Sequence, residues 1–180
     1  MNLETMQRFA AKELSRCGID HPFIQKGRTY ATNGQWCIRH AKPLDGALAE
    51  GWFPPCDSVI PSRDKLSETP LILPDGEAPV QPMMECGACH GGCECHCECG
   101  NKHACEQCGG TGKMPDGPPP AHDFGEVAVQ WKHIAVLREL GSTLYPHIET
   151  PERRPVYFVV DDETDGAVMP CLMPKPAPAR

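Results

Sequence analysis

The sequence predicts an α+β fold in which short antiparallel strands outnumber two helices and a small cysteine-rich insertion interrupts the body. Three observations predict it. Short β-forming runs alternate with turn signals, two stretches repeat apolar residues at helical spacing, and eight of the twelve cysteines lie within 23 positions. Twenty prolines and seventeen glycines among 180 residues leave little room for long elements. We expect one domain that carries one insertion.

The first helix is predicted from Leu3 to about Ser15. Asn2 is suited to cap it, and Glu4 suits the positive end of the helix dipole. Its apolar face repeats at helical spacing through Leu3, Met6, Phe9 and Leu14. Its opposite face carries a stripe of charged side chains, each four residues from the next, at Glu4, Arg8, Lys12 and Arg16.

Short strands are expected after this helix. Phe23-Ile24 predicts one strand, and residues 30–39 predict a hairpin because Asn33-Gly34 is a strong signal for a two-residue turn. Between residues 54 and 82, seven prolines admit only short pieces such as Leu71–Leu73.

Regular structure is predicted to resume after a second proline-rich stretch at 115–120. The expected elements are a strand at Val127–Val129, a helix from Gln130 to Leu140 that stops at Gly141, and a hairpin of 156–160 and 167–169 around a turn at 161–166. The proline-rich stretches on both sides of the cysteines set the predicted boundaries: a body of residues 1–83 and 115–170, an insertion at 84–114, and a proline-rich tail at 171–180.

Two C-x-x-C pairs frame the cysteine cluster: Cys86/Cys89 and Cys105/Cys108. Glycines follow each pair. Structural zinc takes four soft ligands in a tetrahedron, and a C-x-x-C turn delivers two of them together. The glycines let backbone N–H groups turn toward the sulfurs. We do not expect the first residues to act as a secretory signal, and no apolar run is long enough for a membrane span. Clustered thiols in a reducing compartment favour metal over disulfides. We therefore predict a four-thiolate zinc site in a cytoplasmic protein.

Four more cysteines lie at alternate positions between the pairs: Cys93, Cys95, Cys97 and Cys99. They predict a second zinc, so two zinc ions per chain are expected and one is the minimum. Alternate side chains of an extended strand project to one face, so this segment must bend if the four thiols surround one ion. Two alternatives stay open: these cysteines are spare thiols, or histidines replace some of them as ligands, from among His90, His96 and His103.

Residues 105–112, Cys-Glu-Gln-Cys-Gly-Gly-Thr-Gly, form a complete C-x-x-C-x-G-x-G repeat that resembles the cysteine-rich zinc domain of DnaJ-type co-chaperones. Residues 86–92 begin the same pattern, with Cys93 at the position of the last glycine. In that family the first repeat shares a zinc with the last, and the two middle repeats share another. The resemblance therefore implies an outer site of Cys86, Cys89, Cys105 and Cys108 and an inner site of Cys93, Cys95, Cys97 and Cys99. The middle repeats are degenerate, and the family's J-domain motif is missing because Phe23 follows His21-Pro22.

Other interpretations of the cluster are weaker. A redox C-x-x-C is usually isolated at the start of a helix, and Gly109–Lys113 lacks the first glycine and the final Ser/Thr of a phosphate loop. A catalytic zinc keeps an open coordination position, whereas eight available sulfurs favour closed structural sites. The remaining cysteines are expected to act as small buried apolar residues: Cys17, Cys37, Cys56 and Cys171.

Three stretches of the body have a common resemblance: residues 31–34 (Ala-Thr-Asn-Gly), 127–140 and 167–170. They resemble, in this order, the Ala-Thr-Asp-Gly turn, a strand with its helix, and the closing strand of a bacterial sliding-clamp domain. The resemblance implies assembly into a ring and helices that face DNA, with DNA-facing residues Arg8, Lys12 and Arg16. The residue pattern alone favours a solvated helix face with a Glu4–Arg8 pair.

The formal net charge of −7 argues against indiscriminate binding to nucleic acid or anionic membranes. The sequence offers no nucleophile–base pair, acidic dyad or nucleotide loop, so a non-enzymatic protein is expected. The leading hypothesis is a zinc-binding adaptor or accessory protein, encoded by a phage or mobile element, that recognises another protein through its DnaJ-like module. The alternative is a clamp-like, homo-oligomeric DNA-binding accessory protein that acts in replication or interferes with a host nucleic-acid machine.

Overall fold

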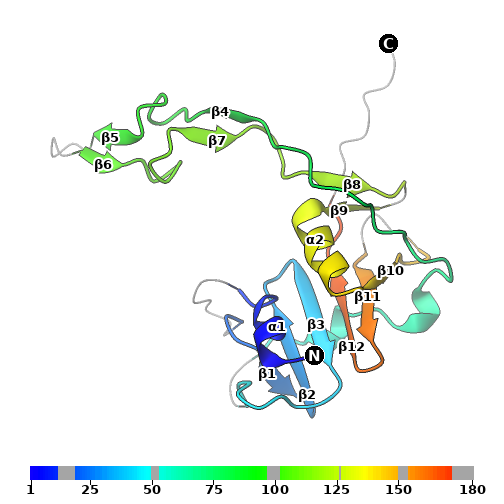
Figure 1. Cartoon of the computed structure of the whole chain (residues 1–180). Helices are drawn as coiled ribbons and strands as arrows, with labels where there is room; N and C mark the ends of the chain where they lie inside the picture. The colour runs from blue at the N-terminus through cyan, green and yellow to red at the C-terminus, as the bar shows by residue number, and fades with distance from the viewer. Residues whose placement is uncertain (12–18, 50–52, 97–101, 126, 150–153, 172–180) are drawn as a thin grey trace. The chain divides into compact units, whose positions relative to one another are not determined.

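The structure is a computed structural model that describes residues 1–11, 19–49, 53–96, 102–125, 127–149 and 154–171 (Figure 1). The chain divides into two compact units. The body comprises Met1–Asp75 and Ala121–Arg180, and the cysteine module comprises Gly76–Pro120, which contains the predicted insertion. A membrane span needs about 18 apolar residues in one helix, and the described part of the chain has no such helix.

The described body is built on one antiparallel sheet of six strands, in the order β1-β2-β3-β12-β11-β10, and a smaller pairing of β8 with β9. Short antiparallel strands with few helices confirm the α+β class. In chain order the elements are α1 (Leu3–Gln7), β1 (Phe23–Gln25), β2 (Arg28–Thr32), β3 (Trp36–His40), the 3-10 turns η1 (Cys56–Ser58) and η2 (Arg63–Lys65), β8 (Ala121–Asp123), β9 (Ala128–Gln130), α2 (Trp131–Glu139), β10 (Thr143–Tyr145), β11 (Val156–Asp161) and β12 (Thr164–Val168).

Local turn chemistry explains the hairpins. Asn33 and Gly34 (φ +83°) lie in the loop that joins β2 to β3, as predicted, but this loop is longer than two residues because Thr32 pairs with Cys37. Lys26 (φ +51°) and Gly27 (φ +74°) make a second tight turn between β1 and β2 that sequence reasoning missed. The last hairpin was predicted with too long a turn: the N–H of Glu163 bonds to the Asp161 carboxylate at 2.9 Å, so the chain reverses early and β12 begins before Ala167.

The first helix is shorter than predicted. Asn2 caps it as expected, because its side chain accepts the N–H of Thr5 at 2.8 Å. The helix ends at Gln7, after which the N–H groups of Phe9 and Ala10 bond three residues back, to Met6 and Gln7, at 3.0 and 3.2 Å. This tighter turn accompanies the packing of the Phe9 ring on Trp36, with the ring centroids 4.3 Å apart. Residues 12–18 lie outside the described ranges.

Side-chain alternation along the strands gives the sheet two apolar faces. On the first face, α1 and α2 cover a core that includes Met6, Phe9, Ala31, Ile38, Ile134, Leu137, Phe158 and Val168. On the second face, the segment 53–66 covers a core of Phe23, Tyr30, Cys37, Cys56, Ile60, Leu66, Tyr157 and Ala167. The two halves of the body meet at the centre of the sheet, where β3 pairs with β12.

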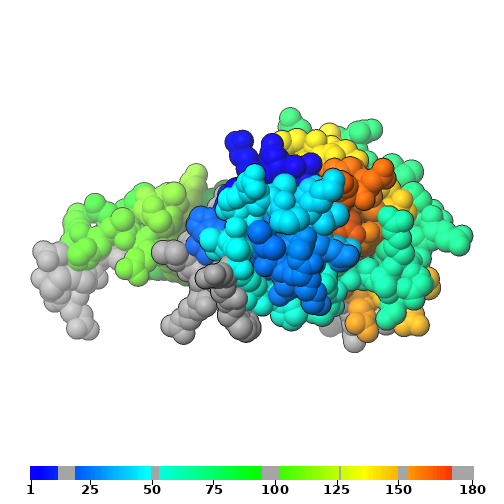
Figure 2. Space-filling view, turned by 90° about the horizontal axis from the view of Figure 1, so that it is seen from below, coloured from blue at the N-terminus to red at the C-terminus, as the bar shows by residue number. Residues whose placement is uncertain are grey.

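Other segments of the chain cover both outer edges of the sheet. Leu48 bridges to Phe23 beside β1 and accepts the N–H of Ile24 at 2.7 Å. In Figure 2 the cyan atoms that follow β3 lie against the blue atoms of the first strands. Leu71 bridges to Leu144 at the β10 edge. Addition of another copy's strand to either edge would therefore displace part of the chain itself.

Candidate metal centre

The cysteine module is a narrow antiparallel ribbon. Its strands are β4 (Met83–Glu85), β5 (Glu94–His96), β6 (Lys102–Ala104) and β7 (Lys113–Pro115), paired as β4 with β7 and β5 with β6. Between the two ladders, each side of the ribbon carries one tight loop. We call residues 86–93 the first knuckle and residues 105–112 the second knuckle.

The two knuckles bring four thiols together, and these are the outer-site cysteines that the sequence predicts: Cys86, Cys89, Cys105 and Cys108. All four Sγ atoms lie within 4.8 Å of one another. The Sγ atoms of Cys86 and Cys105 are 3.7 Å apart, and those of Cys89 and Cys108 are 3.8 Å apart. Four sulfurs at 2.3 Å from a tetrahedral zinc ion would be about 3.8 Å apart. The donor set therefore fits a tetrahedral soft metal.

Burial of this group differs between its members. Cys86 and Cys105 are buried, at 0% and 1% exposure, whereas Cys89 and Cys108 are half-buried. Two backbone ties cross from one knuckle to the other: the N–H of Cys86 donates to the Gly112 carbonyl at 2.9 Å, and the N–H of Cys105 donates to the Cys93 carbonyl at 3.0 Å. These ties hold the two C-x-x-C turns face to face without a contribution from the thiols.

Left-handed backbone shapes both knuckles. Gly109, Gly110 and Gly112 have φ of +61°, +79° and +71° in the second knuckle. This conformation directs the N–H of Gly112 at the sulfur of Cys108, at 3.2 Å. Such an N–H···S bond compensates part of the negative charge that a thiolate would carry, as the glycine spacing predicts.

The structure brings no second cluster of four cysteines together among the residues it describes. The thiol of Cys93 lies 3.6 Å from the Gly91 carbonyl, outside the outer group. Cys95 pairs with His103 in the backbone register of the β5–β6 ladder. Cys97 and Cys99 lie outside the described residues, and the inner site stays a prediction.

Of the three basic residues predicted to face DNA, only Arg8 lies among the described residues. Arg8 lies just beyond the end of α1 and forms a bidentate pair with Glu139 of α2, at 2.7 and 2.6 Å. This hydrogen bond raises the pKa of Arg8 and lowers the pKa of Glu139. The expected partner was Glu4, one helical turn away, but the helix ends before Arg8. Lys12 and Arg16 lie outside the described ranges.

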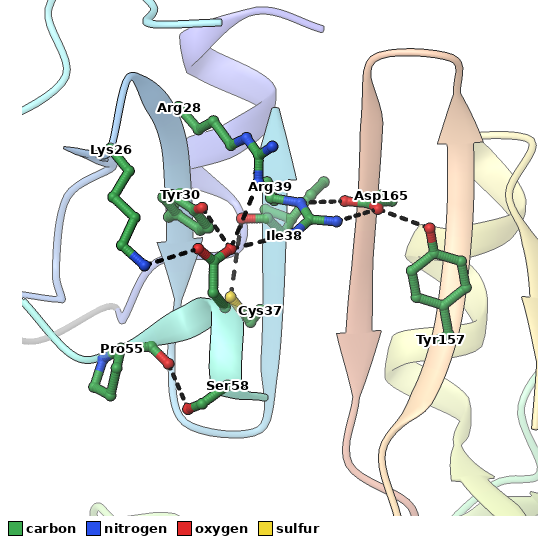
Figure 3. Close-up of polar contacts among 11 residues, drawn as sticks. Lys26, Arg28, Tyr30, Cys37, Ile38, Arg39, Pro55, Ser58, Tyr157 and Asp165 are labelled. Atoms are coloured by element: carbon green, nitrogen blue, oxygen red, sulfur yellow. Dashed lines mark hydrogen bonds and ion pairs between the residues drawn. The ribbon is translucent and has the colours of Figure 1, made fainter. Parts of the chain in front are cut away.

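Sequence reasoning also missed a polar cluster on the second face of the sheet (Figure 3). Asp57 accepts hydrogen bonds from the hydroxyl of Tyr30 at 2.7 Å and from Arg39 at 3.2 Å. Arg39 makes two further bonds to Asp165, at 2.8 and 2.6 Å, and the Tyr157 hydroxyl donates to Asp165 at 2.7 Å. Burial acts to raise the pKa of Asp57, but the bonds from Tyr30 and Arg39 outweigh it and hold the pKa below its usual value. The cluster anchors η1 to the sheet.

Comparisons of the chain with protein-family models, with curated proteins and with solved structures give no match.

Proposed function

We propose that this protein is a non-enzymatic zinc-binding adaptor whose cysteine module binds another protein. The observation that carries the proposal is the approach of four thiols from two knuckles to within 4.8 Å of one another. Thiolate ligands select zinc among the common divalent ions, and a closed set of four suits a structural site. When bound, the ion holds the two knuckles together and contributes folding free energy to the module.

The surface of the module supports protein recognition over phosphate recognition. Residues 84–114 carry four glutamates and two lysines, so the ribbon has no excess of positive charge for a nucleic-acid backbone. Met83 and Met84 of β4 are 54% and 52% exposed, and Met84 pairs directly with Met114 of β7. Exposed methionines are adaptable apolar contacts and are frequent at protein-binding surfaces.

The DNA-binding alternative has less support. It rests on the stripe of Arg8, Lys12 and Arg16, and the charge of Arg8 is already paired with Glu139 of the same body, on its surface. Ring assembly through strand addition would also have to displace the segments at Leu48 and Leu71 that cover the sheet edges.

Native mass spectrometry of zinc-loaded protein tests the metal part of the proposal. We expect at least one zinc per chain in the wild type, two if the inner site also binds, and one fewer in Cys105→Ser. Cys171→Ser is the matched control because Cys171 belongs to the body, and it should keep the full zinc content. Equal zinc content in wild type and Cys105→Ser would refute the outer site.

The recognition part needs a separate experiment. Proteins cross-linked to the zinc-loaded chain in cells would be compared between wild type, Met84→Gln and the control Met169→Gln, whose methionine is 41% exposed on the body. The adaptor proposal expects one or more specific partners that are lost in Met84→Gln and in Cys105→Ser and kept in Met169→Gln. Salt-sensitive binding of the wild type to duplex DNA, abolished by Arg8→Glu, would favour the alternative instead.

A further inference from the structure

A second pair of cysteines lies in the body, far along the chain from the metal centre. Cys37 belongs to β3 and Cys56 is the first residue of η1. Both are buried in the core of the second face, at 2% and 3% exposure. Both also line an open cavity of about 320 Å³. Val59 and Met169, each 41% exposed, line the same cavity.

The two thiols are unequal. The neighbouring Cys56 thiol, together with burial, raises the pKa of Cys37. The neighbouring Cys37 thiol lowers the pKa of Cys56 despite its burial. A thiolate is therefore more readily formed at Cys56.

The polar cluster keeps Cys56 in place. Its neighbour Asp57 accepts hydrogen bonds from Tyr30 and Arg39, and Arg39 lies two residues from Cys37 on the same strand (Figure 3). The η1 turn that carries Cys56 is thus fixed against the strand that carries Cys37. Both thiols belong to one packed cluster and line one cavity, so a bond between them would form inside the core of the second face.

We propose that Cys37 and Cys56 are a site of reversible oxidation by a hydroperoxide that enters through this cavity. The Cys56 thiolate attacks the peroxide, the O–O bond breaks, and Cys56 becomes a sulfenic acid while water leaves after proton transfer. The Cys37 sulfur then attacks the Cys56 sulfur, the S–O bond breaks, and a second water leaves. In total, two thiols and one hydrogen peroxide give one disulfide and two waters. The disulfide joins β3 to η1 and is reversed by a dithiol reductant.

Peptide mapping of the zinc-loaded full chain tests this proposal. Trypsin separates the two residues, because Cys37 falls in the peptide 29–39 and Cys56 in the peptide 40–63, and neither peptide holds another cysteine. After hydrogen peroxide and alkylation, we expect these peptides to be cross-linked with the loss of two hydrogens. Dithiothreitol should restore both free peptides.

Variants test the order of attack. Cys37→Ala should abolish the cross-link and leave Cys56 as a sulfenic acid that dimedone traps, whereas Cys56→Ala should leave Cys37 unmodified. Cys171→Ala is the matched control and should cross-link like the wild type. The absence of a cross-link in wild type at peroxide doses that oxidise Cys171 would overturn the proposal, and this result does not depend on any variant folding. Equal trapping of Cys37 in Cys56→Ala would overturn the assignment of Cys56 as the attacking thiolate.

Discussion

Cys93 and Gly112 occupy equivalent positions in the two knuckles of the cysteine module. Each follows the first cysteine of its knuckle by seven residues, and each accepts through its carbonyl the N–H of the first cysteine of the other knuckle. Their φ angles are nearly the same, +64° for Cys93 and +71° for Gly112. A side chain in this left-handed region costs about 1–2 kcal/mol, which glycine avoids. The first knuckle thus holds a strained cysteine where the second holds a glycine.

This relationship predicts opposite effects for two exchanges. Cys93→Gly removes the strain, and because metal binding and folding of the module are coupled, the outer zinc should bind up to about tenfold more tightly. Gly112→Ala adds strain, and its Cβ would meet the Gly91 carbonyl oxygen at 2.5 Å, so the zinc should bind at least about tenfold more weakly. Competition with a chromophoric chelator measures both affinities.

The control for these two variants is Gly87→Ala. Gly87 has no atom within 4 Å of an added Cβ and no left-handed φ, so its zinc affinity should match that of the wild type. Weaker binding at the outer site of Cys93→Gly would contradict the strain argument. Loss of a second zinc from this variant, with the outer site intact, would instead identify Cys93 as a ligand of the predicted inner site.

Features that depend on near neighbours in the chain could be predicted from the sequence. The Asn33-Gly34 turn, the helix α2 and the outer set of thiols each follow from a spacing of a few residues. Features that depend on distant partners could not be predicted. The pairing of β3 with β12 joins residues more than 120 positions apart, and the Arg39–Asp165 ion pair exists because of this register. The early end of α1 at Gln7 likewise accompanies packing of Phe9 on a residue of β3.

Acid should destabilise the body through His133. This residue of α2 is 3% exposed, and its ring lies 4.5 Å from the Trp36 ring. Burial, with the nearby charge of Lys132, lowers the pKa of His133 to about 4. Between the unfolded pKa near 6.5 and the folded value, only the unfolded chain takes up the proton, so stability falls as pH falls through this window, by up to about 3 kcal/mol.

Urea unfolding at pH 7 and at pH 4.5 measures this loss. Tryptophan fluorescence reports unfolding of the body alone, because Trp36, Trp52 and Trp131 all lie outside the cysteine module. Loss of metal from the module in acid therefore does not contribute directly to this signal. The variant His133→Phe keeps an aromatic ring against Trp36 and should flatten the pH dependence. A pH dependence of the same size in His133→Phe would assign the acid sensitivity to other groups.

The Arg8–Glu139 pair should contribute little to stability, because Arg8 and Glu139 side chains are 40% and 61% exposed. Water screens exposed pairs and so weakens them. Arg8→Glu should lower stability only slightly, through loss of the pair and repulsion from Glu139, and the double variant Arg8→Glu with Glu139→Arg should recover the loss. Thermal unfolding of the four proteins gives the coupling energy. If the double variant recovers nothing, the pair observed between α1 and α2 is not a stabilising contact.

Gly166 should be the least replaceable glycine of the sheet. It lies in β12, paired with Ile38 on one side and Phe158 on the other. An added Cβ would overlap the Phe158 ring and the Cys37 carbonyl, well inside van der Waals contact. Phe158 is fully buried and the Cys37 carbonyl belongs to the central strand β3, so neither can move without disturbing the sheet. Gly166→Ala should therefore lower the free energy of unfolding by about 3 kcal/mol or more.

The control is Gly34→Ala, which makes the same chemical change in the β2–β3 turn. There an added Cβ meets no atom within 4 Å, and only the φ of +83° opposes it. Gly34→Ala should therefore lower the free energy of unfolding by about 1–2 kcal/mol. If Gly166→Ala loses no more free energy of unfolding than Gly34→Ala, the sheet accommodates a Cβ at position 166, and the contact with Phe158 does not restrict the side chain there.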